Sequence, residues 1–226
     1  MLVATPPRLR TRDQLDHNRR ETAVVQPLGR FSASVVLGGL VVAPMVATAR
    51  APHLHARLLS SFGSSWRYWR AGQVWRLFTS AFVQSRHGFV TGIVVLISLL
   101  PLAEWRIGSP RAAIVFLAGD WISSVTAMLG ARVLAAFGSD TASTVLAHVD
   151  SGASSALYAC GGAFVWSLSP SRLRTLLVVI LVGDLTTSAA TNHTLADIQH
   201  PLATLVGAGV MQFSARRDRA EMLSHA

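Results

Sequence analysis

Six apolar segments with few charged residues limit what this chain can fold into. Charged residues make up 14% of the 226 residues and hydrophobic residues 51%, which is typical of a polytopic membrane protein rather than a soluble domain. A membrane-spanning helix needs about 20 mostly apolar residues to cross about 30 Å of hydrocarbon. We therefore expect an all-α fold, a bundle of six transmembrane helices. The segments run from Phe31 to Ala49, His87 to Ala103, Ala112 to Phe137, Gly152 to Leu168, Leu173 to Ala190 and Ile198 to Phe213.

The distribution of arginine predicts how these segments are oriented. All 20 basic residues are arginine, and cytoplasmic loops of membrane proteins collect such residues. With the amino terminus inside, the loops "GSDTASTVLAHVD" and "TNHTLAD" lie outside and hold none. The inside segments hold Arg8, Arg10, Arg12, Arg19, Arg20, Arg30, Arg106, Arg111, Arg172, Arg174, Arg216, Arg217 and Arg219.

This pattern predicts a multi-pass protein of the cell membrane with both termini in the cytoplasm. We expect a cytoplasmic tail over residues 1–30, a membrane domain over 31–213 and a second cytoplasmic tail over 214–226. The net charge of +9 is then explained by arginines that anchor helix ends at anionic lipid headgroups, so no nucleic-acid partner is expected.

The first external segment, residues 50–86, breaks the charge rule. It holds six arginines and, in "SSWRYWRAGQVWRLF", mixes them with aromatic residues. Aromatic and arginine side chains together are typical of a segment in the headgroup layer. We expect this connection to be an interfacial lobe.

Two polar residues at membrane depth suggest chemistry. Ser154 falls in the first turn of the fourth segment and His200 in the first turn of the sixth, and both segments begin on the external side. A serine hydroxyl becomes a useful nucleophile when a histidine accepts its proton. Small residues would let the two helices approach closely. Those residues are Gly152, Ala153, Gly161 and Gly162 on the fourth segment and Ala203 and Gly207 on the sixth.

The same residues also allow readings without catalysis. A serine among small residues is commonly a packing residue, and a histidine within a membrane is commonly a hydrogen-bonding one. Asp120 and Asp184 lie within the third and fifth segments, where a carboxylate is costly, and either pair with a neighbouring helix or line the path of a small-solute transporter. Asp150 and Asp197 suit helix amino termini.

Five ordered motifs run through the apolar segments and the first external loop. They are "VWRLFTSAFV" at 74–83, "RHGFVT" at 86–91, "EWRIG" at 104–108, "GASSALYA" at 152–159 and "HPLATLVG" at 200–207. In order and in helix assignment they resemble the motifs of the rhomboid intramembrane serine proteases. The resemblance covers roughly residues 60–210 and implies a rhomboid-like membrane domain that needs no metal and no cofactor.

The resemblance also implies roles for particular residues. Ser154 would attack the scissile carbonyl of a transmembrane protein substrate, and His200 would accept and return its proton. Tyr158, one helical turn after Ser154, would stack on the imidazole. The oxyanion would meet the Ser154 backbone amide and the side chain of His87, with Thr91 at the position of a second donor.

Three residues depart from the family pattern. Thr91 stands where the family has an asparagine, Ser155 where a glycine is usual beside the nucleophile, and Ala203 where a glycine is usual between His200 and Gly207. The family includes members that keep the fold and lose catalysis. A non-catalytic protein that binds membrane clients is therefore the alternative to a protease.

Overall fold

The computed structural model of the chain describes residues 31–84, 89–191 and 194–224. Within these ranges all regular secondary structure is helical, and the only extended pairing is an isolated bridge between Ser64 and Asp150. The prediction of an all-α fold is therefore confirmed for the described part of the chain.

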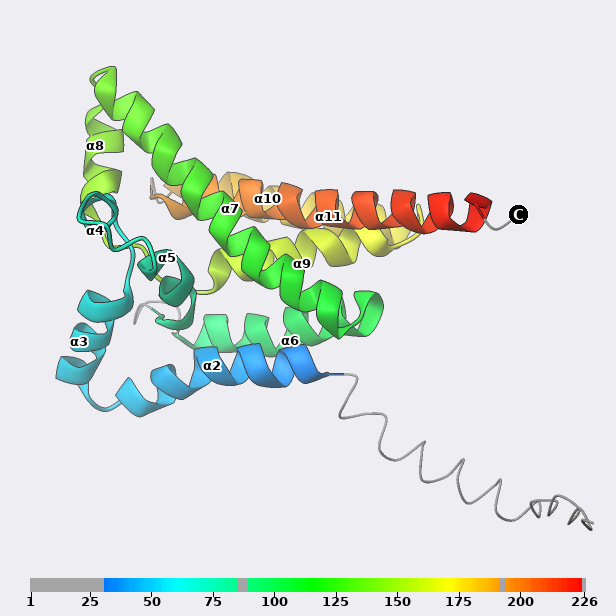
Figure 1. Cartoon of the computed structure of the whole chain (residues 1–226), viewed down its shortest axis with the longest axis horizontal. Helices are drawn as coiled ribbons and strands as arrows, with labels where there is room; N and C mark the ends of the chain where they lie inside the picture. The colour runs from blue at the N-terminus through cyan, green and yellow to red at the C-terminus, as the bar shows by residue number, and fades with distance from the viewer. Residues whose placement is uncertain (1–30, 85–88, 192–193, 225–226) are drawn as a thin grey trace, which may run out of the picture.

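Six long helices lie where the six apolar segments predicted them. Figure 1 shows that α2 begins and α11 ends at the same end of the molecule, as expected when successive helices reverse direction. The helices are α2 (Ser32–Thr48), α6 (Phe89–Ile107), α7 (Ser109–Ala136), α9 (Ser154–Ser167), α10 (Arg172–Thr191) and α11 (Ala196–Ser224).

Two described helices are long and apolar enough to cross a membrane by themselves. These are α7, with a mean hydropathy of 1.7 over its most apolar stretch, and α10, with 1.6. No residue in that stretch of α10 is buried, so its apolar side chains all remain at least partly exposed. In contrast, α9 has 14 residues, which at 1.5 Å per residue gives about 21 Å, shorter than the hydrocarbon layer.

The short helix α9 forms the centre of the bundle. Nine of its 14 residues are buried, and it packs against α6, α7 and α11. Small side chains make this possible: a Cβ added to Gly119 of α7 would lie 2.1 Å from the Cβ of Ala159. Protein neighbours thus surround α9 on several sides.

The segment before α6 folds into a compact lobe tied together by Arg76. The lobe contains α3 (Pro52–Phe62), α4 (Trp66–Arg70), α5 (Arg76–Thr79) and the 3₁₀ turn η1 (Ser80–Phe82). The buried Arg76 guanidinium donates to the carbonyl oxygens of Ser60, at 2.6 Å, and Gly63, at 3.2 Å. It also lies 3.7 Å from the centre of the Tyr68 ring.

A buried carboxylate joins α2 to α6. Glu104 is fully buried and accepts hydrogen bonds from the backbone N–H groups of Ala33, at 2.8 Å, and Ser34, at 2.7 Å, as well as from the Ser34 hydroxyl. These N–H groups belong to the first turn of α2, which lacks intrahelical acceptors. The glutamate of the "EWRIG" motif therefore caps a neighbouring helix.

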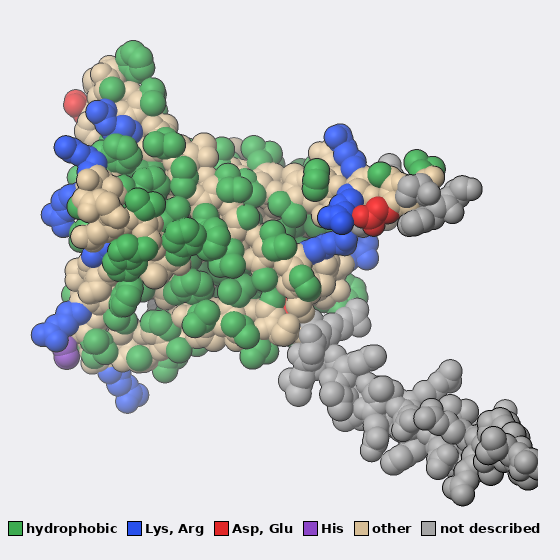
Figure 2. All heavy atoms as spheres, viewed as in Figure 1, with side chains coloured by type: hydrophobic (Ala, Val, Ile, Leu, Met, Phe, Trp, Pro, Cys, Tyr) green, Lys and Arg blue, Asp and Glu red, His purple; other side chains and the backbone are tan. Residues whose placement is uncertain are grey.

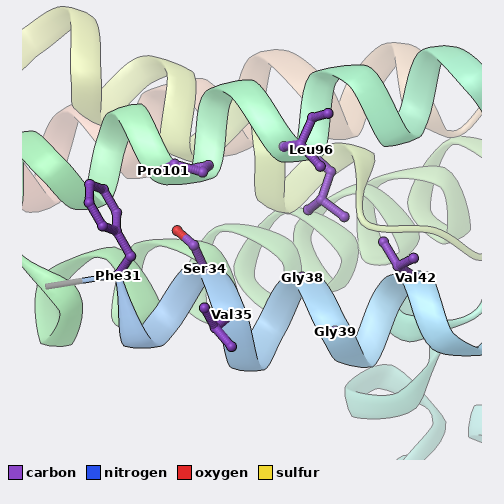
Figure 3. Close-up of a pocket in the computed structure, with 9 residues that line it drawn as sticks. Phe31, Ser34, Val35, Gly38, Gly39, Val42, Leu96 and Pro101 are labelled. Carbon is purple, nitrogen blue, oxygen red and sulfur yellow. The ribbon is translucent and has the colours of Figure 1, made fainter. Parts of the chain in front are cut away.

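The outer surface between α2 and α6 carries an apolar groove of about 380 Å³ (Figure 3). Figure 3 shows the side chains of Phe31, Leu96 and Pro101 around it, and the backbone of Gly38 and Gly39 forms part of its floor. The described residues that line it include no titratable side chain, so this groove offers no acid or base.

Two element boundaries differ from the sequence predictions. The loop expected after the third segment contains a further helix, α8 (Asp140–Ala147), whose N-cap Ser139 accepts a hydrogen bond from the Ala142 N–H. The last helix was expected to end near Phe213 and instead continues to Ser224. An i,i+4 ion pair between Arg217 and Glu221, at 2.8 Å, supports this polar extension.

Candidate active site

Ser154 and His200 meet where α9 and α11 begin. The His200 Nε2 atom lies 3.0 Å from the Ser154 Oγ atom, within hydrogen-bonding distance. Ser154 is the first residue of α9 and is exposed, whereas His200 is 9% exposed. The structure therefore brings together the two residues that the sequence analysis singled out for acyl transfer.

Tyr158 positions the imidazole through its ring. The two ring centres are 4.1 Å apart and the planes differ by 20°, a stacked arrangement. The Tyr158 hydroxyl donates a hydrogen bond to the Asp184 Oδ2 atom of α10. Among the described residues, the buried Nδ1 atom of His200 has no hydrogen-bond partner. Stacking thus holds the ring where a carboxylate would do so in a Ser-His-Asp triad.

The pair opens into a cavity of about 650 Å³. Apolar side chains from α2, α6, α9 and α10 form most of its wall, including Met45, Leu99, Leu157 and Leu181. The polar groups that reach it include Ser154, His200, Tyr158, Asp184 and Gln84. The cavity wall is thus mostly apolar, and the hydroxyl of Ser154 and the imidazole of His200 are among the few polar groups that it exposes.

The loop before α9 is anchored to the lobe. Ser64 and Asp150 exchange two backbone hydrogen bonds, of 2.9 and 2.7 Å, and the Gly152 N–H donates to the Ser80 carbonyl at 2.9 Å. Gly152 has a φ of 114°, which favours glycine, and a Cβ there would lie 2.8 Å from the Gln84 Oε1 atom. The lobe thereby sets the start of the helix that carries Ser154.

Gln199, the residue before His200 on α11, connects this helix to the loop that precedes α9. Its side-chain Nε2 donates to the Asp150 carboxylate at 2.7 Å and to the Ser124 hydroxyl at 3.2 Å. The Ser155 hydroxyl lies 3.5 Å from the Gln199 Oε1 atom, on the buried side of α9. Ser155, which stands where the family pattern has a glycine, therefore places its side chain between α9 and α11, and it does not line the cavity.

The expected capping role of Asp150 is wrong. The N-cap of α9 is Ala153, and no side chain caps the helix there. Asp150 instead pairs its backbone with Ser64, and its carboxylate accepts a hydrogen bond from Gln199 of α11. Withdrawal from water raises the pKa of the Asp150 carboxyl, although hydrogen bonds from Gln199 and from the Ser151 N–H act in the opposite direction.

The other acidic residues divide between the predicted roles. Asp197 lies in the first turn of α11 and accepts from the Thr194 N–H at 2.5 Å, as expected at a helix amino terminus. Asp184 pairs with a neighbouring helix through Tyr158. Asp120 is buried, and its Oδ2 atom has no hydrogen-bond partner among the described residues. The predicted pairing of Asp120 with a neighbouring helix is therefore not seen at that atom.

The oxyanion-binding candidates are only partly described. His87 lies outside the described residues, as does the side chain of Thr91, whose backbone belongs to α6. The Ser154 N–H is at the first position of α9 and so has no acceptor within its own helix. The amino end of a helix favours a negative charge, so this end of α9 suits a developing oxyanion.

Glycines allow the close contact of α9 with α11. A Cβ at Gly162 would lie 2.3 Å from the Thr204 carbonyl oxygen, and one at Gly207 would lie 2.0 Å from the Ala159 carbonyl oxygen. Ala203 is fully buried. Of the residues predicted for helix packing, Gly162 and Gly207 therefore lie at this interface and leave no room for larger side chains. A Cβ at Gly152 would instead meet Gln84 before α6, and one at Gly161 would lie 3.9 Å from Leu99 of α6.

Sequence reasoning missed Gln84 and Gln199. Gln199 could have been identified, because a polar amide at the start of an apolar segment indicates a buried hydrogen-bonding residue just as the neighbouring histidine does. Gln84 follows the "VWRLFTSAFV" motif directly, and nothing in the local pattern marks it as part of the cavity wall.

Comparisons with known proteins assign no family: no family model matches the chain, and no curated protein matches it.

Proposed function

We propose that the protein is a rhomboid-type intramembrane serine protease that cleaves transmembrane proteins with a Ser154–His200 dyad. The observation that carries the proposal is the 3.0 Å approach of the His200 Nε2 atom to the Ser154 hydroxyl inside a largely apolar cavity. The order of the five sequence motifs supports the same assignment.

The membrane arrangement belongs to this proposal. The six long helices cross the bilayer, with α9 shielded from lipid by its neighbours and both termini in the cytoplasm. The apolar surfaces of α7 and α10 support this arrangement. So does the distribution of charge, because Figure 2 shows basic side chains gathered at two ends of the molecule and hydrophobic side chains over much of the face between them.

The dyad acts by nucleophilic and general acid–base catalysis. His200 accepts the Ser154 proton through Nε2 while Oγ attacks the scissile carbonyl, and then donates that proton to the leaving amine. Water next attacks the acyl-enzyme, His200 acts again as the base, and the free serine is restored. Throughout, Tyr158 keeps the imidazole facing Ser154, and the amino end of α9 stabilises the oxyanion.

The cavity supports an apolar polypeptide segment as the substrate. Its wall is formed by apolar side chains of α2, α6, α9 and α10, which suit an apolar segment that has left its helical conformation. A polypeptide that remains helical hides its carbonyl groups in i to i−4 hydrogen bonds. We therefore expect cleavage where a transmembrane substrate contains helix-breaking residues.

A non-catalytic client-binding protein is the second candidate function. The departure that favours it is Thr91, whose hydroxyl is shorter than the asparagine amide of the family pattern and would reach less far toward an oxyanion. Such a protein would use the cavity to hold an apolar segment without breaking a bond.

Proteolysis in liposomes separates the two candidates. The full chain is reconstituted with single-span reporter proteins whose transmembrane segments contain glycine or proline, and fragments are followed by gel and mass spectrometry. The protease proposal expects cleavage by the wild type and by the neighbouring control Ser155→Ala, and none by Ser154→Ala or His200→Ala. Reporter cross-linking to the cavity without cleavage by any of the four would instead support client binding.

A further inference from the structure

A basic pocket lies at the end of the molecule where α6 and α9 finish. It has a volume of about 560 Å³ and is formed by the last residues of α6 and α9 and the middle of α11. Its lining includes Arg106, Trp166, Ser167, Met211 and Arg216. The proposed proteolysis does not use this pocket, because Ser154 lies at the opposite end of α9.

Arginine side chains are held in place around the pocket. Arg106 donates through Nη2 to the Ser167 carbonyl at 3.0 Å, and Arg174 donates through Nη1 to the Leu168 carbonyl at 3.3 Å. The Arg174 guanidinium also lies 4.6 Å from the centre of the Trp166 ring. A guanidinium has five N–H donors, so each keeps donors for a further acceptor after these contacts.

Among the described residues, no carboxylate lines the pocket beside Arg106 and Arg216. The nearby Glu104 is buried against the first turn of α2, and Glu221 on α11 pairs with Arg217. An anion with several oxygen acceptors is the ligand that such an arginine pair binds best, through charge-assisted and often bidentate hydrogen bonds.

We propose that this pocket binds the phosphodiester group of an anionic phospholipid. A lipid fits better than free phosphate because Trp166, Met211 and Ala215 give the pocket apolar walls beside its two arginines. Basic pockets between membrane helices on the cytoplasmic side are sites for such headgroups. The inference rests on the proposed membrane placement and is independent of proteolytic activity.

Lipid titration tests the proposal on the intact chain. Protein carrying Ser154→Ala, so that hydrolysis plays no part, is purified in an uncharged detergent. Native mass spectrometry then follows binding of phosphatidylglycerol, phosphatidylcholine with the same acyl chains, and inorganic phosphate. Arg106→Gln and Arg216→Gln are compared with Arg132→Gln, which removes an exposed arginine from the far end of α7.

The expected result is saturable binding of one phosphatidylglycerol at least tenfold tighter than phosphatidylcholine. That preference should fall at least fivefold in Arg106→Gln and in Arg216→Gln and persist in Arg132→Gln. Arg216 makes no described contact that the fold needs, so its variant keeps the test valid if Arg106→Gln unfolds. Equal affinity for the two lipids, loss of the preference in Arg132→Gln only, or equally tight binding of inorganic phosphate would overturn the proposal.

Discussion

At the scale of single residues, the His200 imidazole is positioned by packing. Its Nε2 atom meets Ser154, its face meets Tyr158, and no described residue bonds its Nδ1 atom. In a Ser-His-Asp triad a carboxylate selects the tautomer and the orientation of the ring. Here the aromatic stack supplies the orientation, and the tautomer with the proton on Nδ1 leaves Nε2 free to accept the serine proton.

Substitution of Tyr158 separates its ring from its hydroxyl. Tyr158→Phe keeps the stack on His200 and loses the hydrogen bond to Asp184, so we expect the rate of Ser154 phosphonylation by a fluorophosphonate to fall less than about threefold. Tyr158→Ala removes the stack, which is worth about 0.5–1.5 kcal/mol, and should slow phosphonylation up to about tenfold. A larger loss in Tyr158→Phe than in Tyr158→Ala would show that the hydroxyl is the important group.

The buried carboxyl of Asp150 should make the free energy of unfolding depend on pH. Because burial raises the pKa of its carboxyl in the folded protein, the unfolded chain gives up this proton at lower pH than the folded one. The contribution of Asp150 is therefore fully present below about pH 4 and is lost as the pH rises through the folded pKa. Asp150→Asn keeps an acceptor for Gln199 and does not titrate.

We accordingly expect the stability of Asp150→Asn relative to the wild type to increase from pH 4 upward and then level off. Chemical unfolding in detergent at several pH values measures the difference. A difference that stays constant with pH, or that shrinks as the pH rises, would contradict the buried-carboxyl account of this loop.

At the scale of helices, the contact of α9 with α11 leaves no space for added atoms. A Cβ at Gly207 would lie 2.0 Å from the Ala159 carbonyl oxygen, whereas nothing lies within 4 Å of one at Gly209. Gly207→Ala should destabilise the fold by about 1–3 kcal/mol through overpacking. Gly209→Ala, in the same helix, should be neutral or stabilising by up to about 1 kcal/mol.

Thermal unfolding of the two glycine variants, together with the rate of Ser154 phosphonylation by a fluorophosphonate, measures both effects. Because His200 and Ser154 lie on the two helices, Gly207→Ala should also slow phosphonylation while Gly209→Ala leaves it unchanged. Equal behaviour of the two variants would mean that the helices are not in close contact at this point.

Helix positions were largely predictable from hydropathy, and contacts between helices were not. The apolar segments around α2, α6, α7, α10 and α11 signal burial in lipid or protein whatever their neighbours are. The role of Asp150 depends on contacts with Ser64 and Gln199, which are 86 and 49 residues away along the chain. No local sequence pattern predicts those contacts. The pairing of Ser154 with His200 was predictable because both begin helices on the same side.

At the scale of the whole molecule, the proposed topology places both ends of the chain on one side of the membrane. With Cys160 replaced by serine, single cysteines introduced after residue 224 and at Gly108 should react with a membrane-impermeant maleimide from the cytoplasmic side only. A cysteine at Gly138, between α7 and α8, should react from the opposite side only. Labelling of Gly108 and Gly138 variants from the same side would rule out a membrane-crossing α7.

The most direct test of the central claim is the site at which a fluorophosphonate attaches to the folded protein. The probe is added to the detergent-solubilised wild type, Ser154→Ala and His200→Ala, and the modified peptide is identified by mass spectrometry. The dyad predicts a phosphonylated Ser154 in the wild type and no adduct in either variant. A wild type that is folded yet unmodified, or an adduct that survives Ser154→Ala, would contradict an activated serine at this position.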